Sequence, residues 1–219
     1  MEALQKIKPK RLLLPTKFKL FYAAYKNKSF NYLDIGCGSH SPTSTKTWFP
    51  NCTYDGIDKQ NYNNSEDDFN VMNNFYSIDL TKDSLSEIPD NHYDIIMLSH
   101  VIEHLENGDA VVAQAVKKLK TGGKIYIEYP GASSLSLPNM RGTLNFSDDP
   151  THVRIYDIKE ISNLLLQNSC TIIKAGIRKD PVRRWLFPLI WLDAYLRNVP
   201  GGAFWDVCDF AEYVYAERK

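Results

Sequence analysis

Short apolar runs that end in polar or glycine-rich turns recur through the first 130 residues of the chain. They cover residues 30–35, 53–58, 75–78, 93–98 and 124–129. Runs of this length and apolar content are typical of strands that are buried on both faces of a parallel sheet. We therefore predict five strands in this part of the chain.

A helical pattern lies between the last two of these strands. Apolar positions recur at helical spacing from residue 110 to 119, lysines gather in the last turn, and Gly122 and Gly123 follow as a stop signal. Strands that alternate with helices indicate a parallel sheet with helices on both faces. The Asn-rich and Asp-rich stretch 60–74 is predicted to be a loop.

The second half of the chain departs from this rhythm. Residues 132–150 are rich in Ser, Asn, Gly and Asp and predict a long loop, which at such a length is more often functional. A helix is expected at 157–167, with strands at 171–177 and 210–216. An aromatic stretch interrupted by prolines fills residues 180–209 and is predicted to be an insertion.

These patterns divide the chain into an N-terminal helical arm over residues 1–29 and one domain over residues 30–219. With 219 residues, of which 43% are hydrophobic, the chain is long enough for one well-buried domain. The loop 132–150 and the insertion 180–209 are the elaborations of that domain. We expect them to form the side of the site that binds the second substrate.

Charge and cysteine usage narrow the partners and the compartment. Lys plus Arg equals Asp plus Glu at 26 each, so no overall field favours nucleic acid, and we expect no nucleic-acid partner. The four cysteines show no metal-binding spacing and are predicted to be reduced thiols of a cytoplasmic protein. The longest apolar stretch, 185–192, is too short to cross a bilayer.

The residues that follow the strands carry the candidate chemistry, because ligands of such sheets bind beyond the carboxyl ends of the strands. The first strand runs through Asp34 into a turn that contains Gly36 and Gly38, where the backbone can approach a ligand closely. Asp58 ends the second strand, and its carboxylate can accept hydrogen bonds from both hydroxyls of a ribose. Asp79 follows the third strand and can accept from an adenine amino group.

A glycine turn followed by an acid also suits NAD. An NAD site would favour a third glycine at the position of Ser41, and Asp34 would repel a pyrophosphate. A carboxylate at that position instead favours a zwitterionic ligand with an amino group. An NAD-dependent oxidoreductase is therefore the less favoured interpretation.

Six segments in one order stand out in the first 130 residues: 33–38, 56–58, 77–80, 93–97, 100–105 and 119–124. Together, and in this order, they resemble the class I S-adenosylmethionine-dependent methyltransferases of the small methyltransferase-domain type. The resemblance implies a Rossmann-like α/β fold with a seven-stranded, mostly parallel sheet, helices on both faces and an antiparallel last strand. Many members have a third glycine where this chain has His40.

The same resemblance implies S-adenosylmethionine as the cofactor and assigns its contacts. Asp34, Gly36 and Gly38 would line its methionine end, Asp58 would hold the ribose, and Asp79 and Leu80 would bracket the adenine. Ser99 and His100 would lie near its amino acid portion and the entrance for the substrate. The predicted cofactor-binding residues are Asp34, Gly36, Cys37, Gly38, Asp58, Asp79, Leu80, Ser99 and His100.

Residues 148–156 are the candidate acceptor segment. Similar Pro-Thr-His-Val-Arg segments occur in methyltransferases of this type that act on glycans, lipids or small metabolites. A hydroxyl acceptor must lose its proton during transfer, and an imidazole suits that role, so His152 is the candidate catalytic base. The alternative is that His152 and Arg154 only order the loop through hydrogen bonds.

The predicted function is therefore O-methylation of a sugar, a glycan or a small-molecule acceptor. Alternatives are a lipid-linked acceptor, an N-methyltransferase, and a non-catalytic module that only binds S-adenosylmethionine. The apolar stretch 182–192, with two arginines at its edge, either contacts a membrane surface or lipid, or packs an inserted helix onto the core. The oligomeric state stays open.

One further pattern concerns metal chemistry. His100, Glu103 and His104 match the HxxEH motif of inverted zinc peptidases, in which both histidines share one helical face. That motif needs a further ligand and its own structural context. We therefore expect no metal site, and a helix start at which His104 is packed or capping.

Overall fold

The computed structural model describes residues 14–219, so residues 1–13 of the predicted N-terminal arm lie outside the described part. The described part of the arm contains the 3-10 turn η2, Thr16–Phe18, and the short helix α1, Tyr22–Tyr25. Phe18 and Phe21 are fully buried and pack against the ring of Phe49. This part of the arm thus contributes to the core of the domain.

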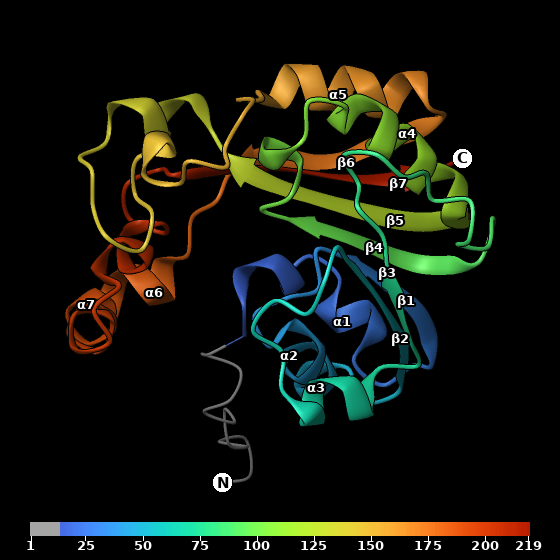
Figure 1. The fold of residues 1–219 in the computed structure, drawn as a ribbon, viewed down its shortest axis with the longest axis horizontal. Helices are drawn as coiled ribbons and strands as arrows, with labels where there is room; N and C mark the ends of the chain where they lie inside the picture. Colours follow the sequence, from blue (N-terminus) through green and yellow to red (C-terminus); the bar gives the residue numbers. More distant parts are fainter. Residues whose placement is uncertain (1–13) are drawn as a thin grey trace, which may run out of the picture.

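A single seven-stranded sheet runs through the described residues, in the order β3-β2-β1-β4-β5-β7-β6 (Figure 1). The first five strands pair in parallel, and β7 is antiparallel to both β5 and β6. The predicted fold class is therefore confirmed. The strands are β1 Phe30–Ile35, β2 Cys52–Asp58, β3 Asn74–Ser77, β4 Tyr93–Ser99, β5 Leu119–Pro130, β6 Cys170–Ile177 and β7 Ala211–Arg218.

Helices cover both faces of this sheet, as Figure 1 shows. α1, α2 and α3 lie on one face, whereas α4 and α5 lie on the other. Asp157 starts α5 by accepting a hydrogen bond from the backbone N–H of Glu160, which satisfies one of the free donors of the first turn. The further bounds are α2 Ser41–Trp48, α3 Glu66–Val71, α4 Gly108–Lys118 and α5 Ile158–Gln167.

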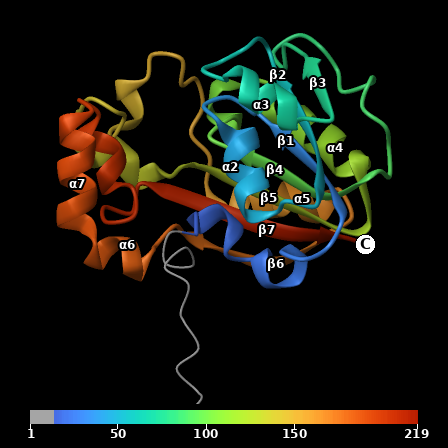
Figure 2. The same cartoon turned by 90° about the horizontal axis from the view of Figure 1, so that it is seen from below.

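The two predicted elaborations lie together beyond the carboxyl end of β5 (Figures 1 and 2). The loop 132–150 contains two 3-10 turns, η4 Ala132–Ser136 and η5 Phe146–Asp148. The insertion 180–209 is helical, with α6 Pro181–Trp185, α7 Phe187–Leu196 and the 3-10 turn η6 Pro200–Phe204. Because the Trp205 indole N–H donates to the carbonyl of Thr143 at 2.6 Å, the loop and the insertion hold each other in place.

Two predicted boundaries were wrong. The predicted loop 60–74 contains α3, whose start is marked by a capping box between Ser65 and Asp68 that the sequence displays. β5 begins at Leu119 and passes through Gly122 and Gly123, which lie at an irregularity of the β4–β5 pairing instead of ending a helix. Gly122 has a φ of +78°, which explains the glycine there. The helix α2 was not predicted.

Candidate active site

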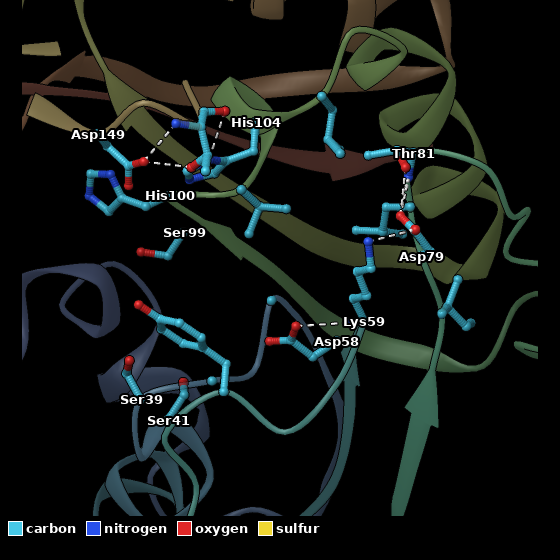
Figure 3. A pocket seen from close by; sticks show the side chains of 18 of the residues that line it. Ser39, Ser41, Asp58, Lys59, Asp79, Thr81, Ser99, His100, His104 and Asp149 are labelled. Carbon is cyan, nitrogen blue, oxygen red and sulfur yellow. Dashed lines mark hydrogen bonds and ion pairs between the residues drawn. The ribbon is translucent and has the colours of Figure 1, made fainter. Parts of the chain in front are cut away.

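A cavity of about 770 Å³ opens at the carboxyl ends of the central strands, in the size range of ligand pockets (Figure 3). It lies where the chain order reverses between β1 and β4, which is the place where doubly wound sheets bind ligands. Of the nine predicted cofactor-binding residues, Asp34 and Cys37 do not line the cavity. The other seven do, and they are Gly36, Gly38, Asp58, Asp79, Leu80, Ser99 and His100.

The turn after β1 brings bare backbone to the cavity wall. Gly36 has a φ of +82°, and a Cβ on Gly38 would lie 2.8 Å from the carbonyl oxygen of Tyr62. His40, at the position where many relatives have glycine, adopts the left-handed conformation with a φ of +59°. Its Nδ1 lies 2.6 Å from the buried Asp68 carboxylate, and this contact holds the turn without a glycine.

Asp34 lies beneath the cavity instead of in its wall. Its carboxylate accepts hydrogen bonds from the hydroxyls of Ser41 at 2.5 Å and Tyr54 at 2.6 Å, and only Ser41 also lines the cavity. Burial raises the pKa of Asp34, which the charge of Lys17 and the two hydroxyls only partly offset. Asp34 is therefore connected to the cavity through the Ser41 hydroxyl.

Cys37 points into the core. A Cβ on Gly56 of β2 would lie 2.6 Å from its sulfur, so the two residues pack in direct contact. Burial, reinforced by the charges of Asp34 and Asp58, raises the pKa of the Cys37 thiol far above its usual range. The side chain is a buried thiol with no access to the cavity, and its place in the turn is explained by packing.

Carboxylates on β2 and after β3 face the cavity (Figure 3). Asp58 accepts the backbone N–H of Lys59 at 2.8 Å through Oδ1, and burial raises its pKa. Asp79 accepts from the Thr81 hydroxyl at 2.6 Å and lies 3.0 Å from the Lys59 ammonium, and these contacts lower the pKa of Asp79 to about 2. Asp79 is therefore ionised and already paired.

His100 directly follows β4, lines the cavity and has a φ of +58°. Its two ring nitrogens lie 3.2 Å from carboxylate oxygens of Glu103 and Glu128. Burial alone would lower the pKa of His100, but these carboxylates raise it to about 9. The ring is therefore an imidazolium at neutral pH, and it lies against Trp205 with ring centroids 4.7 Å apart.

A buried ion network supports this wall. Glu128 on β5 accepts from Arg178 at 2.9 Å, and Arg178 also binds Asp206 with two nitrogens at 2.8 and 3.2 Å. Burial alone would raise the pKa of Glu128, but the charge of Arg178 and the bond from His100 hold it well below its usual range. The network connects the insertion to the sheet and thereby places Trp205 in the cavity.

His152, the predicted catalytic base, does not line the cavity. It lies directly behind His104, which is part of the cavity wall. The two imidazole centroids are 4.8 Å apart. The HxxEH segment forms only the 3-10 turn η3, Ile102–His104, so His100 and His104 do not share a helical face. His100 contacts Glu103 and Glu128, whereas His104 contacts Thr151.

The predicted set lacks several residues of the cavity wall. Lys59 directly follows the predicted residue Asp58, and Ser41 lies three positions after Gly38, so proximity in sequence was the available signal. Tyr62 and Trp205 come from the loop after β2 and from the insertion. Their sequence positions show no pattern that indicates a turn back to the site.

Known proteins resemble this chain in sequence at the level of the family and in structure at the level of the fold. The methyltransferase domain family matches residues 7–175. No curated protein matches the chain in sequence. The chain belongs to the methyltransferase domain family, and it is, as predicted, an S-adenosylmethionine-dependent methyltransferase.

Solved structures agree on the fold. A methyltransferase from Archaeoglobus fulgidus is 19% identical with a TM-score of 0.58, and 94% of each chain is covered. One from Mesorhizobium loti is 14% identical with a TM-score of 0.61, covering 94% of this chain and 100% of that one. The 1,6-didemethyltoxoflavin-N1-methyltransferase of Burkholderia thailandensis, solved with S-adenosylhomocysteine, is 10% identical with a TM-score of 0.58, covering 95% and 78%.

The buried network predicts a large effect for Arg178→Met. The variant leaves the carboxylates of Glu128 and Asp206 buried without their main cation, which should lower the free energy of unfolding by ~3 kcal/mol. Arg197→Met, which removes an exposed arginine of the insertion, should change it by less than ~0.5 kcal/mol. Urea denaturation followed by circular dichroism measures both, and equal effects would contradict the importance of the network.

Proposed function

We propose that this methyltransferase transfers the methyl group of S-adenosylmethionine to a hydroxyl group of a sugar or another small-molecule acceptor. The proposal rests on one observation: the two ends of a single cavity carry different chemical groups. A carboxylate on β2 lies near bare backbone at one end, and His104 lies at the other, with the ring of His152 packed behind it. The first end suits the donor, and the second suits an acceptor that loses a proton.

The donor end fits S-adenosylmethionine. The backbone at Gly38 is closed in by Tyr62 and leaves no room for a side chain, and the Asp58 carboxylate accepts the backbone N–H of Lys59 and has no side-chain partner among residues 14–219. Asp58 would hold the ribose hydroxyls, Leu80 would contact the adenine, and Ser41 would contact the amino acid portion above Asp34. The cofactor supplies a methyl group on a positively charged sulfur, which needs no further activation.

The acceptor end has to align a hydroxyl oxygen and remove its proton. The Nδ1 of His152 lies 2.7 Å from the carbonyl oxygen of Phe146, so Nδ1 carries hydrogen and Nε2 is free to accept a proton. Alignment of donor and acceptor supplies most of the rate enhancement in such transfers. Trp205 and Asp149, from the insertion and the loop, close this end of the cavity.

Two neighbouring structures are named as N-methyltransferases, one acting on 1,6-didemethyltoxoflavin and one on phosphoethanolamine, at 10% and 15% identity. An amine acceptor is therefore the second candidate. The proposal of a hydroxyl acceptor depends on the imidazoles of His104 and His152, because an amine that binds uncharged needs less help from a base. The cytoplasmic location stays a prediction.

Asp58→Ala is expected to weaken binding of S-adenosylmethionine by roughly 10- to 100-fold, because a charge-assisted hydrogen bond contributes about 1.5–3 kcal/mol. Isothermal titration calorimetry measures this change. Asp67→Ala is the matched control, since Asp67 is exposed and does not line the cavity. Absence of binding by the unmodified protein would contradict the assignment of the donor end.

His152→Ala is expected to keep cofactor binding and to lose turnover by ~10²- to 10⁴-fold, the usual contribution of a positioned base. The measurement is S-adenosylhomocysteine release with matched sugar and amino-sugar acceptors. His92→Ala serves as the control, because His92 contacts Asn31, away from the cavity. Full turnover in His152→Ala would refute the role, and turnover on the amino-sugar alone would favour the amine acceptor.

The insertion supports a lipid-linked variant of this proposal. Trp185, Leu189 and Leu196 of α6 and α7 are exposed by 81%, 67% and 75%, and Arg183 and Arg184 lie in the last turn of α6. Exposed apolar and basic side chains on a short helix suit contact with an anionic membrane surface. No helix within residues 14–219 is long and apolar enough to span a bilayer.

This contact predicts that the protein floats with anionic phospholipid vesicles in a density gradient. Trp185→Ser combined with Leu189→Ser should strongly reduce flotation, because two of the most exposed apolar side chains of the insertion are lost. Ile173→Ser, which removes a 48% exposed apolar side chain from β6, should leave flotation unchanged. Unmodified protein that stays with the soluble fraction would disprove membrane contact.

A further inference from the structure

Glu103, His104 and His152 converge behind the acceptor end of the cavity. One potential ligand atom of each lies within 4.8 Å of the others. Glu103 and His104 belong to the turn η3 after β4, whereas His152 follows the loop 132–150. From this convergence we infer that the three side chains bind one divalent transition-metal ion.

The hydrogen bonds of the two histidines leave a lone pair free on each. The Thr151 hydroxyl donates to Asp149 at 2.5 Å, so it accepts from the Nδ1–H of His104 at 2.9 Å. The Nδ1–H of His152 donates to the carbonyl of Phe146 at 2.7 Å. Both rings are thus held by Nδ1, and Nε2 is unprotonated in each neutral ring.

Histidines that bind metals almost always donate their other ring N–H to a carboxylate, a hydroxyl or a backbone carbonyl, which fixes tautomer and orientation. Phe146 and the Thr151–Asp149 pair provide such partners here. Asp149 is held ionised, because the hydrogen bonds from Thr151 outweigh the effect of burial and lower its pKa. These contacts prepare both rings as ligands.

Glu103 provides an independent observation. Its side chain is completely buried, and Oε1 lies 3.2 Å from the ring of His100. Its Oε2 has no hydrogen-bond partner among the described residues. A buried carboxylate oxygen without a partner is costly, and a cation bound to it would remove that cost.

The backbone holds these side chains in register. The N–H groups of Val153 and Arg154 both donate to the carbonyl oxygen of Glu103, at 2.9 and 3.2 Å. The acceptor segment is therefore fixed to η3 next to its carboxylate. Of the nearby cations, Arg154 is paired with Asp109 and Glu160, and His100 lies between Glu103 and Glu128.

The ligand set selects the class of metal. Two imidazole nitrogens with one carboxylate suit Zn²⁺, Mn²⁺ or Fe²⁺, whereas Mg²⁺ and Ca²⁺ prefer oxygen ligands. This set differs from the HxxEH motif, because His152 replaces His100 as the second imidazole. The expectation of no metal site considered only the HxxEH motif and therefore did not consider the cluster of Glu103, His104 and His152.

His104 lines the cavity, so an ion at this position borders the acceptor end. Resting on the proposed function, a bound ion would lower the pKa of the acceptor hydroxyl, whose proton would pass to solvent. With the ion bound, His152 would be a ligand, and without it the Nε2 of His152 would be free to take the proton. Metal binding itself depends only on the three side chains. The two statements are therefore separable by experiment.

The test uses the full chain, dialysed against a chelator and titrated with Zn²⁺ and then Mn²⁺ by isothermal titration calorimetry. We expect one equivalent to bind, with Glu103→Gln, His104→Ala and His152→Ala each weakening the affinity at least tenfold. His92→Ala should bind as the unmodified protein does. Titration of S-adenosylmethionine into each variant shows that it is folded, because Asp58 lies at the other end of the cavity.

Two results would overturn the inference: no binding of either ion, or an affinity that all three variants leave unchanged. Cobalt(II) gives a second readout, since its visible spectrum should show nitrogen and carboxylate ligation that Glu103→Gln alters. Methyl transfer to a hydroxyl that persists in chelator without bound metal would reject the role of the ion and leave the proposed function intact. Stoichiometric metal binding combined with methyl transfer only to amines would reject the hydroxyl acceptor of the proposed function and leave the metal site intact.

Discussion

The wall of the cavity depends on one buried carboxylate, Glu128 on the central strand β5. Burying a charge is costly unless it is paired, and Glu128 is paired with Arg178, bonded to His100 and bonded to the Tyr126 hydroxyl at 2.5 Å. Each of these bonds fixes a different part of the site. His100 is held in its left-handed conformation at the end of β4, and Arg178 carries the insertion through Asp206.

The two ends of the cavity are built from different parts of the chain. The donor end is built from turns that directly follow β1, β2 and β3, so the sheet itself positions it. The acceptor end comes from η3, the loop 132–150 and the insertion, which are held by side-chain contacts beyond the sheet. Fold similarity at 10–19% identity therefore covers the strands that carry the first end and says nothing about the side chains of the second.

The same distinction explains what could be predicted from the sequence. Apolar runs locate strands, and strand ends locate ligand-binding residues, so Gly36, Gly38, Asp58 and Asp79 were predicted correctly to lie at one edge of the sheet. Proximity in sequence does not tell which way a side chain points. Asp34 therefore lies beneath Ser41, and Cys37 points into the core.

Other features of the site depend on contacts between distant residues, which a single sequence does not display. Arg178 meets Glu128 across 50 positions, and Trp205 lies against His100 next to Asp206, which is bound to Arg178. The start of α3 was different, because Ser65 and Asp68 display a capping box that local reasoning can find.

The acceptor segment shows how short motifs gain meaning from such contacts. Residues 100–104 suggest a zinc-peptidase helix when they are considered alone, yet they form only a 3-10 turn, and His100 contacts the buried Glu128. His104 instead lies against His152, and one oxygen of the neighbouring Glu103 has no hydrogen-bond partner among the described residues. Through Glu103, which contacts His100, the ion network of the cavity wall borders the group of possible metal ligands found among residues 14–219.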